Sequence, residues 1–262
     1  MQLKNSRILL TGATGGLGHE LARQLAASGA RLLVAGRDTQ RLAALSNELG
    51  PECSTVRADL GRPDGIAAVV GAAHEFGVNV LINNAGIGGF GLYDQQDWAD
   101  VQQLLATNLE VPLHLTHALL PWLKSRPEAA IVNIGSTFGS LPFPGFAAYS
   151  AAKAGLRGFS QALRRELSDS KVAVIHLAPR AIDTPLNTAA VNALNRELKN
   201  HCDTTESVAR QIVSSLQKET LERHFGFPER LFAWLNGIAP SLIDHGLAAK
   251  LPVIKRHALS RT

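Results

Sequence analysis

Cysteine is scarce in this chain of 262 residues, which contains only Cys53 and Cys202. The two lie far apart in sequence and form no CxxC pair, so neither a disulfide framework nor a zinc site is indicated. We therefore expect a reducing compartment and a cytoplasmic protein. The nine histidines show no HxH or HExxH spacing, and no metal site is predicted.

Long apolar runs and strong charge are also missing. No stretch of 18 apolar residues occurs, so no membrane-spanning helix is expected, and the first ten residues lack the apolar run of a signal peptide. A net charge of +4 is a mild excess for this length. It weakly favours anionic ligands and does not indicate nucleic-acid binding.

Short apolar runs alternate with amphipathic segments along most of the chain. The expected strands, rich in Val, Ile and Leu, are Arg7–Leu10, Arg31–Ala35, Ser54–Arg57, Val78–Asn83, Ala129–Ile134 and Val172–Leu177. The expected helices are Leu17–Ser28, Thr39–Leu49, Pro63–Phe76, Trp98–Lys124 and Tyr149–Ser168. This order predicts an α/β fold: one domain with a doubly wound parallel sheet and helices on both faces.

The pattern weakens after about residue 180. Helices are expected at Asp183–Lys199 and Thr204–Lys218, and a last strand near Arg223–Gly226 has a poor signal. We therefore divide the single domain, residues 1–262, into a core at 5–225 and a C-terminal helical extension at 226–262.

A glycine-rich segment with TGxxxGxG spacing follows the first expected strand. Glycines at this junction let the backbone approach a pyrophosphate, and the next helix offers free N–H groups. The alternative is a plain tight turn, but the position in a βαβ series favours nucleotide binding. The predicted contacts are Gly12, Thr14, Gly15, Gly16, Leu17 and Gly18.

The residues after the second expected strand bear on the choice of coenzyme. Arg37 suits the 2′-phosphate of NADP, whereas an acid at this point would suit the ribose of NAD. Asp38 argues for NAD, but it is also a good N-cap for the helix Thr39–Leu49. We predict NADP, with NAD as the alternative.

Tyr149 and Lys153 stand one helical turn apart, and Ser136 follows the fifth expected strand. A lysine cation near a tyrosine lowers its pKa from about 10, so Tyr149 can act as general acid or base. Ser136 would hydrogen-bond a carbonyl oxygen. Taken singly, YxxxK also occurs by chance and a serine also caps turns.

Over residues 5–185 the chain resembles the short-chain dehydrogenase/reductase family. The glycine segment and Asn83-Asn84-Ala85-Gly86 look like two of its signatures, and Asn108, Ser136, Tyr149 and Lys153 align with its catalytic tetrad. The resemblance implies a Rossmann-like domain, NAD(H) or NADP(H), and interconversion of alcohols and carbonyls. It further implies a ribose contact from Lys153 and a relay water anchored by Asn108. Implied coenzyme contacts are Asp59, Leu60, Asn84, Ala85, Gly86, Tyr149, Lys153, Pro179 and Thr184.

Two positions depart from the family pattern. Pro179-Arg180 stands where Pro-Gly is usual, and Arg180 would meet an anionic substrate group, meet a coenzyme phosphate or point to solvent. Thr14-Gly15 occupies the place of the basic residue that many NADP-using members carry, which weakens the NADP prediction.

The loop between Ser136 and Tyr149 is rich in apolar residues, and the C-terminal tail is amphipathic. Phe138, Phe143, Phe146 and Leu141 indicate an apolar pocket wall, hence a ketone or fatty-acyl-like small-molecule substrate. The amphipathic, basic tail would pack on the core, cover the cleft, contact another subunit or lie on a membrane surface, with packing favoured. By resemblance we expect a homodimer or homotetramer. The prediction is an NADP(H)-dependent oxidoreductase; the alternative is a non-catalytic or membrane-associated nucleotide-binding protein.

Overall fold

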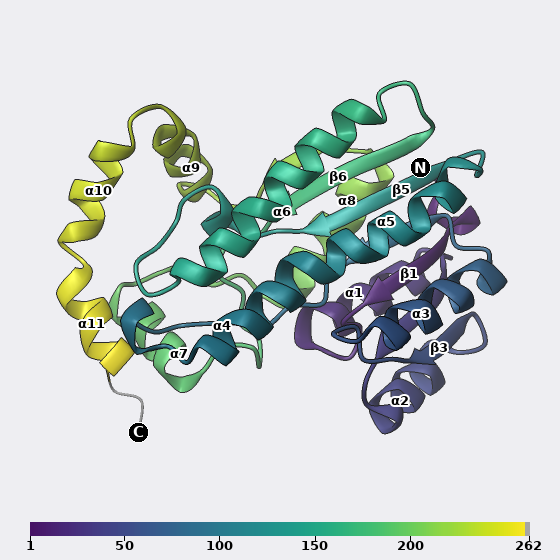
Figure 1. Ribbon diagram of the computed structural model, residues 1–262, viewed down its shortest axis with the longest axis horizontal. Coiled ribbons are helices and arrows are strands. Elements are labelled where there is room, and N and C mark those ends of the chain that lie inside the picture. Colours follow the sequence, from purple (N-terminus) through teal and green to yellow (C-terminus); the bar gives the residue numbers. More distant parts are fainter. Residues whose placement is uncertain (260–262) are drawn as a thin grey trace.

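The computed structural model describes residues 1–259, and this part of the chain contains a parallel sheet of seven strands in the order β3-β2-β1-β4-β5-β6-β7 (Figure 1). The strands are β1 Arg7–Thr11, β2 Arg31–Gly36, β3 Cys53–Arg57, β4 Val80–Asn83, β5 Ala129–Ile134, β6 Val172–Ala178 and β7 Glu222–His224. The order reverses direction between β1 and β4, where an open α/β sheet forms a crevice at the carboxyl ends of its strands. The predicted doubly wound fold is confirmed.

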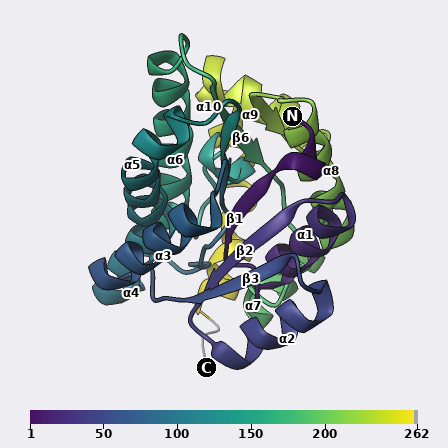
Figure 2. The same cartoon turned by 90° about the vertical axis from the view of Figure 1, so that its right-hand side faces the viewer.

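Helices cover both faces of the sheet (Figure 2). On one face lie α1 Gly16–Ala27, α2 Thr39–Leu49 and α8 Thr205–Gln217, and on the other α3 Pro63–Phe76, α4 Trp98–Leu105, α5 Val111–Lys124 and α6 Ala147–Glu166. Each face of the sheet has its own apolar core, because helices bury the side chains that the strands present on both faces.

Two expected helices differ from those observed. The segment Trp98–Lys124 is not one α-helix, since a π-helical turn, Ala106–Glu110, separates α4 from α5. The helix expected at Asp183–Lys199 is confined to α7, Ala189–Glu197, because Pro185 precedes it and Thr188 caps its first turn by accepting a hydrogen bond from the Val191 N–H.

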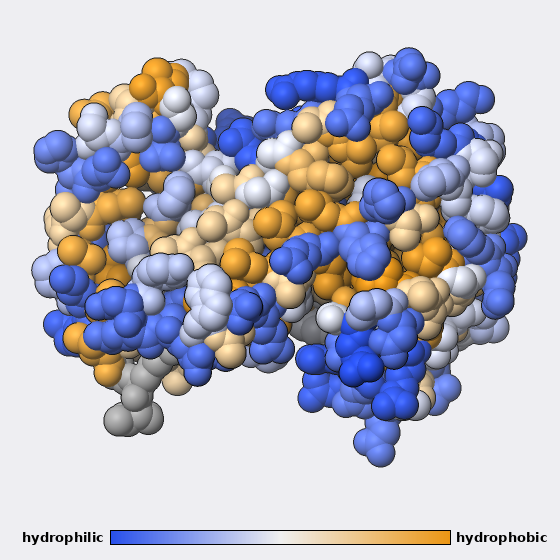
Figure 3. All heavy atoms as spheres, in the orientation of Figure 1, coloured by the Kyte–Doolittle hydropathy of each residue, from blue (hydrophilic) through white to orange (hydrophobic). Residues whose placement is uncertain are grey.

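The C-terminal extension forms an arch of three helices beside the sheet: α9 Glu229–Ile238, α10 Pro240–Ala248 and α11 Leu251–Leu259 (Figure 1). The last of these packs on α7, where Ile254 and Leu194 are both buried. Apolar side chains gather at the surface of the arch (Figure 3), and Trp234, Ile238 and Leu242 are each more than half exposed. Within residues 1–259, no helix is both long enough and apolar enough to cross a membrane.

Candidate active site

A single cleft of about 1820 Å³ runs along the carboxyl ends of the strands. It is larger than the roughly 300–1,000 Å³ of an ordinary ligand pocket, so it has room for a coenzyme and a second molecule. Every site residue predicted from the sequence lines it. These are Gly12, Thr14, Gly15, Gly16, Leu17, Gly18, Arg37, Asp59, Leu60, Asn84, Ala85, Gly86, Asn108, Ser136, Tyr149, Lys153, Pro179 and Thr184.

The glycine loop between β1 and α1 is held tightly by its neighbours. Gly12 has φ +66°, and a Cβ there would lie 2.7 Å from the Cα of Ala85. A Cβ on Gly18 would lie 2.1 Å from the carbonyl oxygen of Gly12. The side-chain amide of Asn84 donates to the carbonyls of Thr11 and Gly12 at 3.0 and 3.2 Å, so Asn84 fixes the loop from behind.

This loop fits a pyrophosphate. Gly15 is the N-cap of α1 and carries no side chain to cap it, so N–H groups of the first turn are available to an anion. Thr184 and Pro185 close the other side, since a Cβ on Gly16 would lie 3.0 Å from Cδ of Pro185. The N-terminus of α1 therefore faces the cleft, with uncharged residues beside it.

Basic side chains stand at the other end of the cleft, beyond β2. Arg37 is exposed, and Arg41, in the first turn of α2, also lines the cleft. Asp38 is occupied as the N-cap of α2, where its carboxylate accepts from the N–H groups of Gln40 and Arg41 at 2.9 and 3.1 Å. The capping role considered for Asp38 is therefore the one the structure displays.

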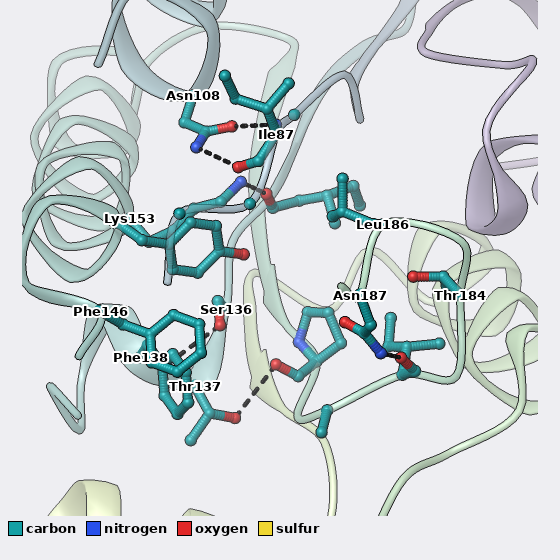
Figure 4. A pocket seen from close by; sticks show the side chains of 18 of the residues that line it. Ile87, Asn108, Ser136, Thr137, Phe138, Phe146, Lys153, Thr184, Leu186 and Asn187 are labelled. Atoms are coloured by element: carbon teal, nitrogen blue, oxygen red, sulfur yellow. Dashed lines mark hydrogen bonds between the residues drawn. The ribbon is translucent and has the colours of Figure 1, made fainter. Parts of the chain in front are cut away.

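Tyr149 and Lys153 lie one turn apart on α6, as the spacing predicted. The ammonium of Lys153 is buried, donates to the carbonyl of Ile134 at 2.9 Å, and lies 5.8 Å from the centre of the Tyr149 ring (Figure 4). Burial lowers the pKa of Lys153 to about 8.

The pKa of Tyr149 is raised, contrary to the expectation that Lys153 lowers it. Burial raises the pKa of the Tyr149 hydroxyl, and a hydrogen bond with Ser136 acts in the opposite direction. The phenol is therefore held protonated beside Ser136, a state suited to donating a proton.

Ser136 caps a turn beside Tyr149. Its Oγ accepts from the N–H of Phe138 at 3.2 Å at the start of the turn Thr137–Gly139, and the same hydroxyl acts to lower the pKa of Tyr149. The backbone of the turn is tied to the next strand, because both the N–H and the hydroxyl of Thr137 donate to the carbonyl of Pro179. The plain role of a turn cap and the catalytic position therefore coexist in one residue.

Asn108 is fully buried in the π-helical turn between α4 and α5. Its side chain forms two hydrogen bonds with the backbone of Ile87 (Figure 4). Oδ1 accepts from the Ile87 N–H at 2.9 Å, and Nδ2 donates to the Ile87 carbonyl at 2.8 Å. A single wide turn of this kind is often found at functional sites. Here it directs an amide inward to fix the strand-end loop that follows Gly86.

A buried histidine lies beneath the catalytic strand end. His176 of β6 is completely buried, and neither ring nitrogen has a hydrogen-bond partner among the described residues. A Cβ on Gly135, the neighbour of Ser136, would lie 2.2 Å from its Nε2, so the imidazole fills the space that a side chain at 135 would need.

Arg180 is neither in solvent nor free to meet a ligand. Its guanidinium binds Asp203 in a bidentate manner, Nε to Oδ2 at 2.9 Å and Nη2 to Oδ1 at 2.8 Å. Its Nη1 reaches Glu229 at the start of α9 at 3.1 Å. The side chain also lies over Gly226, where a Cβ would be 2.7 Å from the Arg180 Cδ. Arg180 thus ties the loop after β6 to the C-terminal extension.

The part of the cleft near Tyr149 is lined by aromatic residues of the loop 137–146. Phe138 and Phe143 stack with ring centres 5.3 Å apart, and Phe146 packs against Phe138 at 5.0 Å and approaches Tyr149 at 6.4 Å. Together they form an aromatic wall next to the reacting hydroxyl.

Several residues of this site were missed by the sequence reasoning. Arg41 has a usable sequence signal, since it is a second basic residue four positions after Arg37, in the first turn of the expected helix Thr39–Leu49. Ile87 and His176 have none, because Ile87 takes part through its backbone and His176 lies inside an ordinary strand pattern. The tail residues Phe232 and Leu247 line the cleft only because the arch folds back over it.

Comparison with known proteins agrees with this geometry. A family model for short chain dehydrogenases matches residues 6–195. The chain is 34% identical over 270 residues to the dehydrogenase/reductase SDR family member 7B of Bos taurus, with 95% of this chain and 82% of the relative covered.

Two solved structures are similar over most of their length. A short-chain dehydrogenase from Sphingobium yanoikuyae in complex with NADPH gives a TM-score of 0.80 at 30% identity and covers 91% of this chain and 95% of its own. A 3-ketoacyl-(acyl-carrier-protein) reductase from Brucella melitensis complexed with NADH gives 0.78 at 27% identity, with 86% and 98% covered.

Proposed function

The chain belongs to the short-chain dehydrogenase/reductase family and is an NAD(P)-dependent oxidoreductase, and we propose that it interconverts a carbonyl and a secondary alcohol on an apolar substrate, with NADP(H) as coenzyme. The observation that carries the proposal is that Ser136 and Tyr149 line the same cleft as the glycine loop. A proton donor and a carbonyl-binding hydroxyl are thus placed side by side.

The roles of the side chains follow from their contacts. When bound, the nicotinamide supplies or accepts the hydride. Ser136 holds the carbonyl oxygen and stabilises the charge that develops on it. Tyr149 donates a proton to that oxygen in reduction and takes it back in oxidation. Lys153, anchored on the carbonyl of Ile134, keeps a positive charge near the phenol, and Asn108 fixes the loop after Gly86.

The preference for NADP(H) rests on the charges beyond β2. Arg37 and Arg41 can both meet a 2′-phosphate, for which a guanidinium is the best matched donor. The adjacent acid, Asp38, accepts from two N–H groups at the start of α2 through one carboxylate oxygen, and its other oxygen pairs with the Arg41 guanidinium at 3.4 Å. Of the two solved structures described above, one contains NADPH and the other NADH, so the preference is inferred from this chain's own residues.

The apolar substrate is supported by the aromatic wall of Phe138, Phe143 and Phe146 beside Tyr149. Desolvation of a ketone against such a wall is favourable, and the reacting oxygen would face the polar pair. The similarity to a 3-ketoacyl-(acyl-carrier-protein) reductase agrees with an acyl-like substrate.

The test is coenzyme oxidation with NADPH and NADH over apolar ketones and β-ketoacyl thioesters, with wild type and Tyr149→Phe. We expect turnover with NADPH that falls by roughly 10²–10⁴ in the variant, while its coenzyme Kd stays unchanged. Coenzyme binding without turnover, identical in both proteins, would instead favour the non-catalytic alternative.

A further inference from the structure

The apolar face of α10 lines the cleft, and no residue among 1–259 buries it. The residues of α10 and the following turn that line the cleft are Leu242, Ile243, Gly246, Leu247 and Lys250. Their spacing of one, four, five and eight residues describes a single helical stripe. No residue of α10 is buried, and Leu242 is 62% exposed. A stripe of this kind gains stability only when something apolar lies against it.

The arch that carries this stripe is fixed at both ends. At one end Glu229 binds Arg180, and the Asn236 side chain donates to the Ser140 carbonyl at 3.0 Å, so α9 is tied to the catalytic turn. At the other end α11 packs on α7, where Arg256 forms an ion pair with Glu197. The helix α10 therefore bridges two anchors as a fixed wall (Figure 1).

An opposing apolar wall faces the same cleft. It consists of Leu186 in the loop before α7 and of Val191 and Leu198 on and just after that helix. Figure 4 shows Leu186 and Thr184 across the pocket from Lys153 and Ser136. The two walls thus continue from the catalytic pair into the space under the arch.

We propose that the space between α7 and α10 binds an extended aliphatic chain of the substrate, whose carbonyl lies at Ser136 and Tyr149. This inference rests on the proposed function and names its substrate class: long-chain ketones or acyl compounds. From Leu242 to Lys250 the stripe spans roughly 12 Å at 1.5 Å per residue, long enough to contact a chain well beyond the carbonyl. The occupant is the substrate because the stripe belongs to the catalytic cleft itself.

The experiment measures kcat/KM for methyl ketones from 2-butanone to 2-decanone with the full chain and NADPH. Each buried methylene should raise kcat/KM roughly fourfold until the stripe is covered. Two substitutions at adjacent positions of α10 provide a matched pair. Leu247→Glu places a charge in the channel, and Ala248→Glu places the same charge on the face that does not line the cleft. Neither replaces a buried residue, so both should fold.

We expect Leu247→Glu to lower the ratio of kcat/KM for 2-decanone to kcat/KM for 2-butanone about tenfold or more, while Ala248→Glu leaves this ratio as in wild type. A flat dependence on chain length, or equal effects of the two variants, would overturn the inference and leave the reductase proposal intact. A change of oligomeric state or of liposome binding in Leu247→Glu, without a chain-length effect, would assign the stripe to a second copy or a lipid surface and also overturn it.

If no ketone is turned over, hydrogen–deuterium exchange of α10 with 1-decanol and 1-butanol separates the two proposals. Protection by 1-decanol alone, lost in Leu247→Glu and kept in Ala248→Glu, would support the channel although the reductase proposal had failed. Absence of that protection would remove the channel as well.

Discussion

Acidification should destabilise this protein through His176. Burial lowers the pKa of the His176 imidazole to about 3, with Glu222 raising it and His224, Arg157 and Lys153 lowering it further. These are the charged and titratable groups that face it from β7 and α6. The native protein therefore keeps His176 neutral, whereas the unfolded chain protonates it below about pH 6.5.

The sign and size follow from proton linkage. Between about pH 6.5 and pH 3 the unfolded state binds one more proton at this site, so the free energy of unfolding falls as the pH falls. The contribution is complete above pH 6.5 and is lost toward pH 3. From pH 7 to pH 5 the loss is about 2 kcal/mol for this one group, at about 1.4 kcal/mol per pH unit once the unfolded imidazole is charged.

The assay is urea unfolding at pH 7 and pH 5, followed by tryptophan fluorescence, on wild type and His176→Leu. The variant should lose about 2 kcal/mol less than wild type over this interval, since it has no imidazole to protonate. His224 has a lowered pKa as well, but it remains in both proteins and cancels in the comparison. His117→Leu removes an exposed histidine from α5 as the control. Equal losses in wild type and His176→Leu would refute the reasoning.

Three further predictions concern named contacts. Gly135→Ala should lower the free energy of unfolding by roughly 1–3 kcal/mol, because the new Cβ would lie 2.2 Å from Nε2 of His176. Thermal unfolding should show that adding His176→Ala to this variant restores part of the lost stability. No recovery in the double variant would remove this explanation. Arg41→Ala should raise the Kd for NADPH about tenfold and leave that for NADH unchanged, as titrations of both would show. Arg180→Met should lower the free energy of unfolding by about 1.5–3 kcal/mol, since Asp203 loses a bidentate partner; urea unfolding of that variant, with Asp203→Asn compared, checks it.

The sheet could be predicted from the sequence because buried parallel strands are continuous apolar runs. The five-residue β1 and the six-residue β5 were found within a residue of their ends. The last strand had only a poor signal, near Arg223–Gly226, and β7 is observed at Glu222–His224. It lies at the edge of the sheet, where side chains such as Glu-Arg-His need not be apolar. The π-helical turn was missed for a different reason: its wider hydrogen-bond spacing leaves no mark on an apolar pattern.

The candidate site was predictable wherever spacing along one element decides proximity. Tyr149 and Lys153 are neighbours because they share a helix, and Gly12 and Gly18 because they share a loop. Contacts that depend on strand register or on chain reversal left no such signal. His176 meets Gly135 because β5 and β6 are paired, and Leu247 reaches the cleft because the arch turns back.

Arg180 lies just after β6 and contacts segments that are distant in the sequence. It stands where the family pattern has glycine, and it fills the space over Gly226, whose φ of +87° and missing side chain allow the close approach. The same guanidinium holds Asp203 and Glu229, so one residue joins the loop that carries Thr184 to the arch that carries α10. The loop after β6 and the C-terminal arch are therefore held by the same guanidinium. Loss of this residue should disturb both binding steps, whereas loss of Glu229 alone should disturb the arch.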